Sequence, residues 1–324
     1  MNLADDALER VCEAVRAETL VAVAVHENPD SDAVGAAAGL IDLFRQLGVR
    51  AALHIDPGVV LPFAAELLGG VPVVQGPPPA GATLYALDCG SRERLAVTLG
   101  DWTGRVVDID HHHDNTRFGD LDLVDGEASS TSELVCLIAA RLGLTPSRAA
   151  ADALYAGISF DTGHFQHDST SATTFVCCAG LVEAGADPHR IYQLLYESRT
   201  LASLRLWARA VAGARPAGAG RALIAVLTTA DFAAAGAADG ETEGVVDSLR
   251  SVAGVDVAAL VRPRDTNGVR VSLRSEGFDV SAVAALKGGG GHRQAAGFSA
   301  DGTVEEVATW LSTELDRRLS TASS

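Results

Sequence analysis

Apolar runs alternate with helical patterns through the first half of the chain. Runs of aliphatic residues with the length of buried strands occur at 20–25, 50–55, 83–88 and 105–110. Residues 33–47 space their apolar positions as a helix does. Because strands that alternate with helices are typical of parallel sheets, we expect an α/β fold that begins with a parallel-sheet domain.

The second half changes pattern twice. Helices are expected near 132–142, 146–159, 170–184, 188–196 and 201–211, the first with a capping box from Ser130 to Glu133. The run "AGARPAGAG" at 212–220 is typical of a linker. Strands at 221–229, 255–262 and 268–275 and a helix at 303–319 then predict a smaller α/β domain. The predicted divisions are 1–196, 197–220 and 221–324.

Composition restricts the setting. The 324 residues suffice for two domains, and a hydrophobic share of 48% allows packed cores. We find neither a signal-peptide pattern nor a run of about 18 apolar residues, so no membrane association is expected. The five cysteines, at 12, 89, 136, 177 and 178, form no Cys-x-x-Cys pair. That pattern favours free thiols in a reducing cytoplasm.

The charge distribution argues against a protein that coats long nucleic acid. The net charge is −17, and residues 250–293, with 7 basic and 4 acidic side chains, form a locally basic segment. Binding along a duplex requires an extended cationic face. The basic segment suits a small anionic ligand or a short strand, or it is merely solvated surface.

Acidic residues and histidines follow the predicted strands. The first strand runs into "HENPDSD", with His26, Asp30 and Asp32, and the strand at 83–88 ends at Asp88. The strand at 105–110 ends in "DIDHHH", and "GISFDTGHF" places Asp161 at the end of a helix. Alone, each Asp is more often a cap or turn residue. The ends of parallel strands share one edge of a sheet, however, so these groups are expected to meet there.

Carboxylates that converge on one edge repel each other unless cations lie among them. An oxygen-rich set with imidazoles and without cysteine favours Mn²⁺ first, with Mg²⁺ or Co²⁺ as alternatives, over structural zinc. Two such metal ions about 4 Å apart would generate a hydroxide nucleophile for attack on phosphorus.

Five motifs carry a family resemblance. "HENPDSDAVGA", "ALDCGS", "DIDHHHDN" and "GISFDTGHF" resemble, in order, the four motifs of the DHH phosphoesterases, and "GGGGHRQAAGF" resembles the signature of their C-terminal DHHA1 domain. The resemblance implies a parallel-sheet DHH domain followed by a smaller α/β DHHA1 domain. The layout is most similar to the branch of nano-RNases and pAp phosphatases. It implies a cytoplasmic hydrolase for short oligoribonucleotides, dinucleotides or the 3′-phosphate of pAp, and leaves a homodimer open.

The resemblance also implies roles for single residues. It gives one metal ion to His26, Asp30, Asp88 and Asp161, and the other to Asp32, Asp88, His111 and Asp161, so that Asp88 bridges. Asp110 would orient a histidine, and His112 would face the scissile phosphate as a hydrogen-bond donor or general acid. Substrate contacts are implied for Arg274, Ser275, Gly289, Gly290, Gly291 and His292. Two departures, Ala36 for the usual serine and Lys287 for an aromatic residue, leave substrate preference open.

Other functions remain as alternatives. A phosphodiesterase of the cyclic di-AMP type would use the same motifs. A manganese inorganic pyrophosphatase shares the first four motifs, but the Gly-Gly-Gly-His signature argues against it. A sensor that binds cyclic dinucleotides without turnover would be expected to lack a metal ligand, and all six positions are filled.

Overall fold

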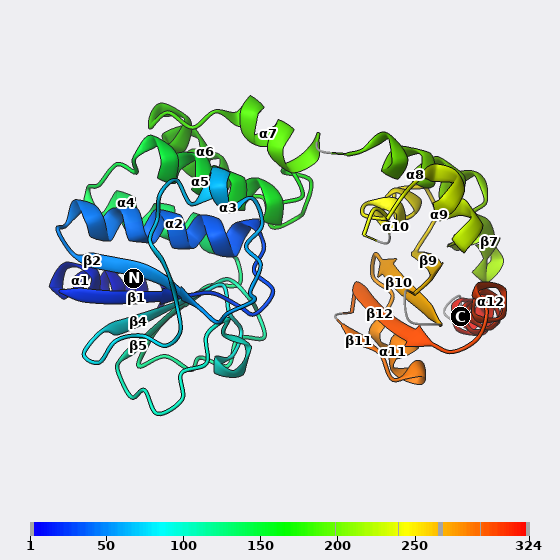
Figure 1. Cartoon of the computed structure of the whole chain (residues 1–324), viewed down its shortest axis with the longest axis horizontal. Coiled ribbons are helices and arrows are strands. Elements are labelled where there is room, and N and C mark those ends of the chain that lie inside the picture. Colours follow the sequence, from blue (N-terminus) through cyan, green and yellow to red (C-terminus); the bar gives the residue numbers. More distant parts are fainter. Residues whose placement is uncertain (1–2, 198, 239, 265–267, 292, 322–324) are drawn as a thin grey trace. The chain divides into compact units, whose positions relative to one another are not determined.

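The computed structural model describes residues 3–197, 199–238, 240–264, 268–291 and 293–321 (Figure 1). The chain divides into two units, Met1–Ser198 and Arg199–Ser324. Each unit has its own sheet and its own apolar core, and each is described by itself.

Six parallel strands form the sheet of the first unit: the four that the apolar runs predict and two more, at 73–75 and 121–124, that they do not. They are β1 (Leu20–Ala24), β2 (Arg50–Ile55), β3 (Val73–Gln75), β4 (Thr83–Leu87), β5 (Val106–Asp110) and β6 (Leu121–Val124). The order across the sheet is β3-β2-β1-β4-β5-β6. The direction of winding therefore reverses between β1 and β4, and parallel α/β sheets usually bind ligands beyond the strand ends at such a point.

Helices cover one face of this sheet. They are α1 (Leu3–Ala17), α2 (Ser31–Gln46), α3 (Ala64–Leu67), α4 (Thr131–Leu142), α5 (Arg148–Asp161), α6 (Ala172–Glu183) and α7 (Pro188–Tyr196). Val23, Tyr85 and Ile109 point into the core on this side. Ala22 and Ala86 point to the other face, which the connections after β4 and β5 cover with a short 3₁₀ turn, η1 (Arg92–Arg94) (Figure 1). The helices therefore concentrate on one side, and the strand ends remain open to irregular connections.

Gly35 lies where α2 and α5 approach closely. A Cβ atom there would lie 2.4 Å from the backbone oxygen of Ala153, which a helix cannot easily move. We expect Gly35→Ala to lower the free energy of unfolding by about 1–3 kcal/mol, although alanine is the better helix former. Gly180→Ala in α6 is the matched control, because a Cβ at that position would meet nothing within 4 Å. This change should raise the free energy of unfolding by up to about 1 kcal/mol. Urea unfolding measures both; equal stabilisation by the two changes would contradict the close approach.

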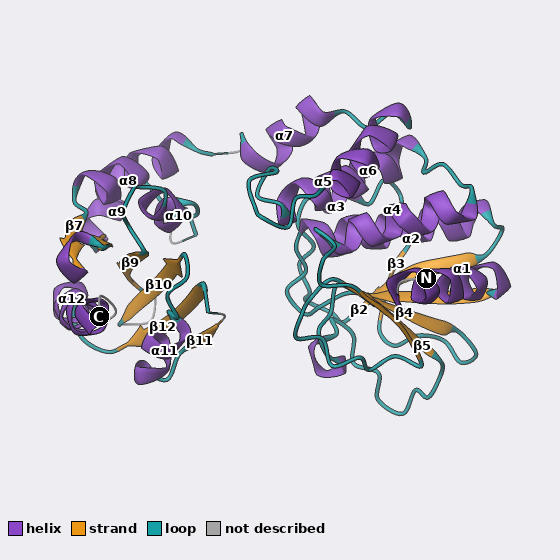
Figure 2. Cartoon of the chain, turned by 180° about the vertical axis from the view of Figure 1, so that it is seen from behind, coloured by secondary structure: helices purple, strands orange, loops and turns teal. Residues whose placement is uncertain are grey.

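The second unit is a mixed sheet between two helical layers (Figure 2). Its strands are β7 (Arg215–Ala217), β8 (Ala222–Val226), β9 (Val257–Pro263), β10 (Val269–Ser275), β11 (Gly290–Gly291) and β12 (Ala295–Ala300). Its helices are α8 (Leu201–Ala212), α9 (Thr229–Ala235), α10 (Val245–Arg250), α11 (Ser281–Ala284) and α12 (Val304–Thr321), with 3₁₀ turns η2 (Gly218–Gly220) and η3 (Ala285–Lys287). Residues of α8 to α10 pack on one face and residues of α11 and α12 on the other.

The predicted linker at 212–220 is part of this second sheet. Residues 215–217 form edge strand β7, antiparallel to β8, and the Gly218 N–H donates to the Asp316 carboxylate of α12. An edge strand tolerates proline, so Pro216 is compatible with β7. The Ala, Gly and Pro composition of residues 212–220 therefore did not indicate an unstructured linker. The helix before it, α8, also falls within the second unit, because the division lies at Ser198.

Candidate metal centre

Ionisable side chains converge at the carboxyl edge of the first sheet, beside the reversal between β1 and β4. His26 follows β1 and Asp88 follows β4, and the His26 Nε2 atom lies 3.6 Å from Asp88 Oδ2. The same nitrogen lies 3.9 Å from Oδ2 of Asp30. The other Asp30 oxygen caps α2 by accepting the N–H groups of Asp32 and Ala33, which fixes this carboxylate.

A second group adjoins the first. His111, directly after β5, places its Nε2 atom 2.9 Å from Oδ2 of Asp161, the last residue of α5. The same nitrogen lies 3.5 Å from Asp88 Oδ1. Asp32, in the first turn of α2, completes this group. Asp88 contacts both groups, one oxygen facing His26 and the other His111, which is the arrangement that a bridging ligand requires.

The two groups have the mutual spacing that a cation needs. His26, Asp30 and Asp88 offer ligand atoms within 4.8 Å of one another, and so do Asp32, His111 and Asp161. The predicted sharing of Asp161 by both ions remains a prediction, because Asp161 joins only the second of these groups among the described residues.

The N-terminus of α4 supports both groups. The Asp32 carboxylate accepts the backbone N–H groups of Thr131, at 2.7 Å, and Ser132, at 2.9 Å. The Thr131 hydroxyl donates to Asp88 Oδ1 at 3.1 Å. Sequence reasoning gave Thr131 no role. The signal available was its place just inside a predicted helix start, where backbone N–H groups bind anions.

The predicted capping box at this helix is only half formed. The Ser130 hydroxyl accepts the Glu133 N–H, as predicted. The Glu133 side chain, however, accepts the hydroxyl groups of Ser129 and Thr174 instead of returning to the helix start. The buried carboxylate thus ties α4 to α6.

Asp110 and His112 form a separate pair beside Asp88. The Nδ1 atom of His112 lies 2.8 Å from Asp110 Oδ1, and Asn115 donates to Asp110 Oδ2 at 2.7 Å. Burial acts to raise the pKa of Asp110, but the hydrogen bonds, first that of His112, outweigh it and lower the pKa. The Asp110 hydrogen bond raises the pKa of His112. The pair therefore favours an ionised Asp110 beside a protonated His112, and the orienting role of Asp110 remains a prediction.

The crowding of carboxylates in a buried position shifts the pKa values of the cluster. Burial, followed by the Asp88 and Asp161 carboxylates, raises the pKa of Asp32 well above its usual value, and burial also raises the pKa of Asp161. Burial acts to lower the pKa of His111, but its contacts with Asp161 and Asp88 raise the pKa to about 12. Divalent cations would relieve the same repulsion without these protons.

The donor set fits divalent metal ions. The buried Nε2 atom of His111 has no hydrogen bond of good geometry to any residue within the described ranges, although two carboxylates lie close to it. A buried polar atom in that situation is the expected position of a metal ligand. Aspartate oxygens with two imidazoles, and no thiolate in either group, match the preferences of Mn²⁺ or Mg²⁺.

Comparison with known protein families identifies the same two domains as the sequence motifs. Residues 20–158 match the model for the DHH family, N-terminal domain, and residues 220–321 match the DHHA1 domain. The bifunctional oligoribonuclease and PAP phosphatase NrnA of Thermus thermophilus is 32% identical over 90% of this chain and 88% of its own length. The chain belongs to the DHH family of phosphoesterases. This family is metal-dependent, in agreement with the acidic cluster.

Two further relatives extend this result. The probable bifunctional oligoribonuclease and PAP phosphatase NrnA of Streptococcus mutans is 28% identical over 90% of this chain and 93% of its length. A crystal structure of an exopolyphosphatase-related protein from Bacteroides fragilis superposes with a TM-score of 0.86 and 24% identity, covering 98% of this chain and 97% of that one. The superposition with the Bacteroides fragilis structure supports the DHH and DHHA1 fold.

The DHHA1 unit places the predicted substrate residues of the described ranges on or beside β10 and β11, two strands that β12 separates. Arg274, near the end of β10, is half-exposed, and its Nε atom lies 3.2 Å from the exposed Asp247 carboxylate. This surface ion pair leaves the guanidinium available to exchange partners. Ser275 is buried, and its hydroxyl donates to the backbone oxygen of Phe278. Ser275 thus holds the turn after β10, and its hydroxyl already has a partner.

The glycine run is required by close packing in the DHHA1 unit. A Cβ on Gly289 would lie 2.3 Å from the Gly297 backbone oxygen, and one on Gly291, whose φ is +134°, would lie 2.5 Å from that of Ala295. Gly290 pairs with Gly297 in the ladder between β11 and β12. Lys287, one of the two departures from the family pattern, lies with Nζ 4.5 Å from the centre of the Trp310 ring. The predicted contact His292 lies outside the described residues.

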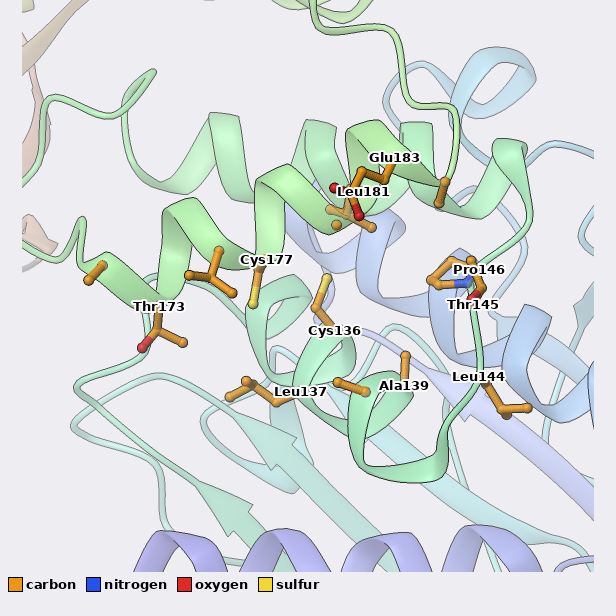
Figure 3. A pocket seen from close by; sticks show the side chains of 15 residues that line it. Cys136, Leu137, Ala139, Leu144, Thr145, Pro146, Thr173, Cys177, Leu181 and Glu183 are labelled. Carbon is orange, nitrogen blue, oxygen red and sulfur yellow. The ribbon is translucent and has the colours of Figure 1, made fainter.

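A large apolar cavity lies away from the acidic cluster. It has a volume of about 700 Å³ between α4 and α6, with Cys136 and Cys177 on its walls (Figure 3). Among the described residues that line it, only Glu183 carries a charge. It offers no group for phosphoester chemistry, so the candidate site is identified from the ionisable residues and not from cavity size. All five cysteines are free thiols. No helix in the described part of the chain is long and apolar enough to cross a membrane.

Proposed function

We propose that this protein is a metal-dependent phosphohydrolase that cleaves short oligoribonucleotides and removes the 3′-phosphate of pAp. The observation that carries the proposal is the pair of ligand groups joined through Asp88 at the sheet edge. Such an arrangement suits hydrolysis of a phosphoester by two metal ions. The five free thiols support a cytoplasmic enzyme.

The substrate class is supported by the relatives and by charge. Both NrnA proteins are named for an oligoribonuclease and a PAP phosphatase, and each covers most of this chain. A net charge of −17 opposes binding along an extended polyanion. Short nucleotides need only a few cationic contacts, which the basic segment at 250–293 can supply.

In this proposal the six ligands hold two ions, with Mn²⁺ preferred over Mg²⁺ or Co²⁺. His26, Asp30 and Asp88 hold one; Asp32, Asp88, His111 and Asp161 hold the other. Bound there, the ions would offset the charge of the phosphate and lower the pKa of a water molecule that attacks phosphorus. The α4 N-terminus keeps Asp32 and Asp88 oriented, through the backbone of Thr131 and Ser132 and through the Thr131 hydroxyl.

His112 is the proposed proton donor. Its Nδ1 atom is engaged with Asp110, so Nε2 is the atom left to face the substrate. The Asp110 hydrogen bond raises the pKa of His112 and so favours the protonated imidazole, which carries a proton on Nε2. His112 can thus donate a hydrogen bond to a phosphoryl oxygen and transfer the proton to the leaving oxygen.

A substrate panel tests the proposed function. We expect rapid Mn²⁺-dependent release of product from pAp and from RNAs of two to four nucleotides, and a steep fall towards a 24-mer, since no cationic track continues along the acidic chain. Initial rates at fixed salt provide the measurement, with cyclic di-AMP and pyrophosphate in parallel. Equal rates on the dinucleotide and the 24-mer would refute the short-substrate proposal. Faster turnover of cyclic di-AMP or pyrophosphate would instead favour those alternatives.

Arg274→Ala tests the proposed role of the second unit in the same assay. A phosphate that displaces Asp247 from Arg274 would gain a charge-assisted contact, so the variant should raise KM about tenfold or more. Arg209→Ala is the matched control: it also breaks an exposed ion pair in this unit, with Asp231 at 3.3 Å, but lies outside the basic segment. Equal KM values for the two variants would remove Arg274 from the proposed substrate contacts.

A further inference from the structure

Aromatic rings gather just beyond the candidate metal centre. The aromatic cluster consists of His164, Phe165, Phe175, Tyr192 and Tyr196, contributed by the turn after α5, by α6 and by α7 (Figure 1). Aromatic residues are only 5% of the chain, so this concentration is a local feature. The His164 ring centre lies 4.8 Å from that of Tyr192 and 5.4 Å from that of Tyr196.

The cluster exposes ring surface to solvent. Phe175 is 56% exposed and Tyr192 is 36% exposed, and His164 is also exposed. A core cluster would bury these rings, since each gains free energy by leaving water. Exposed aromatic groups of this kind are typical of a binding surface.

A strained backbone holds the ring of His164 in place. Gly163, His164 and Phe165 have consecutive φ values of +55°, +59° and +64°. The left-handed region costs about 1–2 kcal/mol for each residue with a Cβ. Thr162 stabilises the turn, because its buried hydroxyl accepts the Phe165 N–H at 3.0 Å. Strain that the surroundings maintain in this way often occurs at ligand-binding sites.

The cluster lies next to a proposed metal ligand. Asp161 ends α5 three residues before His164, and the Tyr196 hydroxyl donates to the backbone oxygen of Ser159 at 2.7 Å. The His164 N–H also donates to Ser159, at 2.7 Å. Hydrogen bonds from the His164 backbone and the Tyr196 side chain to one residue of α5 thus connect both residues to the helix that carries Asp161.

We propose that His164 and Tyr192 form a stacking surface for a nucleobase of the substrate. The inference rests on the proposed function, since it assumes a nucleotide with its phosphate at the acidic cluster. Aromatic side chains stack on any base, so the surface would bind nucleotides without selecting a sequence. It also provides affinity without cationic groups, which the acidic first unit supplies sparingly. His164 and Tyr192 thereby distinguish nucleotides from other phosphoesters.

The test compares AMP with ribose 5-phosphate, which carries the same phosphoester without a base. Calorimetry on the Mn²⁺-loaded protein gives the dissociation constant of each, so the result does not depend on hydrolysis. AMP should bind about tenfold or more tightly than ribose 5-phosphate. His164→Ala and Tyr192→Ala should each reduce this preference at least about threefold, whereas His164→Phe and Tyr192→Phe retain a ring and should preserve it.

His189→Ala, an exposed position on α7, is the matched control and should leave the preference unchanged. Equal affinity of the wild type for AMP and ribose 5-phosphate would overturn the stacking proposal. Equal weakening of both ligands by the alanine variants would also overturn it, since that outcome indicates a role in holding Asp161 or in a contact with a second copy. Absent hydrolysis together with a base preference would refute the proposed function alone.

Discussion

Asp88→Asn is expected to reduce hydrolysis at least about a thousandfold and to lower the number of tightly bound Mn²⁺ ions. Asp88 is the residue that contacts both ligand groups, so its loss affects both proposed ions. Its φ of +56° makes asparagine the informative replacement, because asparagine tolerates this conformation and matches the shape of aspartate. Loss of activity would then report the charge and not a distorted backbone.

The measurement combines initial rates on a dinucleotide with equilibrium dialysis against Mn²⁺. Asp101→Asn, at an exposed turn position before the amino end of β5, is the control and should behave as wild type. A variant that keeps activity within tenfold, or full wild-type hydrolysis after exhaustive chelation, would rule out the two-ion site centred on Asp88.

His112→Ala is expected to reduce turnover by roughly two to four orders of magnitude while most metal binding remains. For His111→Ala, by contrast, the primary defect should be the loss of one metal ion. The contacts motivate the difference: His111 faces Asp88 and Asp161, whereas His112 is engaged with Asp110. Metal titration of both variants decides the matter. If His112→Ala loses an ion and His111→Ala does not, the two roles are reversed.

The pH dependence provides a second readout for His112. Its pKa is raised, mainly by the Asp110 hydrogen bond, so the protonated form is present below that raised pKa and is lost as the pH increases through it. A proton donor therefore predicts a rate that falls on the alkaline side of the profile. His112→Ala should lose this limb, and Asp110→Asn should shift it to lower pH.

The position of the site could be predicted because it depends on topology and on side-chain type. His26, Asp88 and His111 each follow a recognisable strand, and parallel strands bring their carboxyl ends to one edge. The contribution of Thr131 could not be predicted in the same way. The backbone N–H groups of Thr131 and Ser132 bind Asp32 because α4 begins beside it, and a predicted helix start does not show which carboxylate, about a hundred positions away in the chain, those groups will meet.

The elements that escaped prediction have weak local signals. Strand β12 reads "AAGFSA", whose small residues have low strand propensity, and it forms because β10 and β11 pair with it. Helices α9 and α10 are 7 and 6 residues long, too short for a clear helical period. For β12, α9 and α10, packing against neighbours decides the structure. Helix α1, by contrast, has a clear amphipathic pattern, which is a usable helix signal.

The crowding of carboxylates at the strand ends has a consequence for the lifetime of the protein in a cell. The groups that repel one another come from four segments spread between His26 and Asp161, so their repulsion acts on the whole first unit. Metal at a hundredfold excess over its dissociation constant would add about 2.7 kcal/mol of stability by mass action. That amount changes the unfolded fraction roughly a hundredfold. Cellular proteases act mainly on unfolded chains, so the abundance of this protein should follow the cell's supply of the divalent metal that the cluster binds.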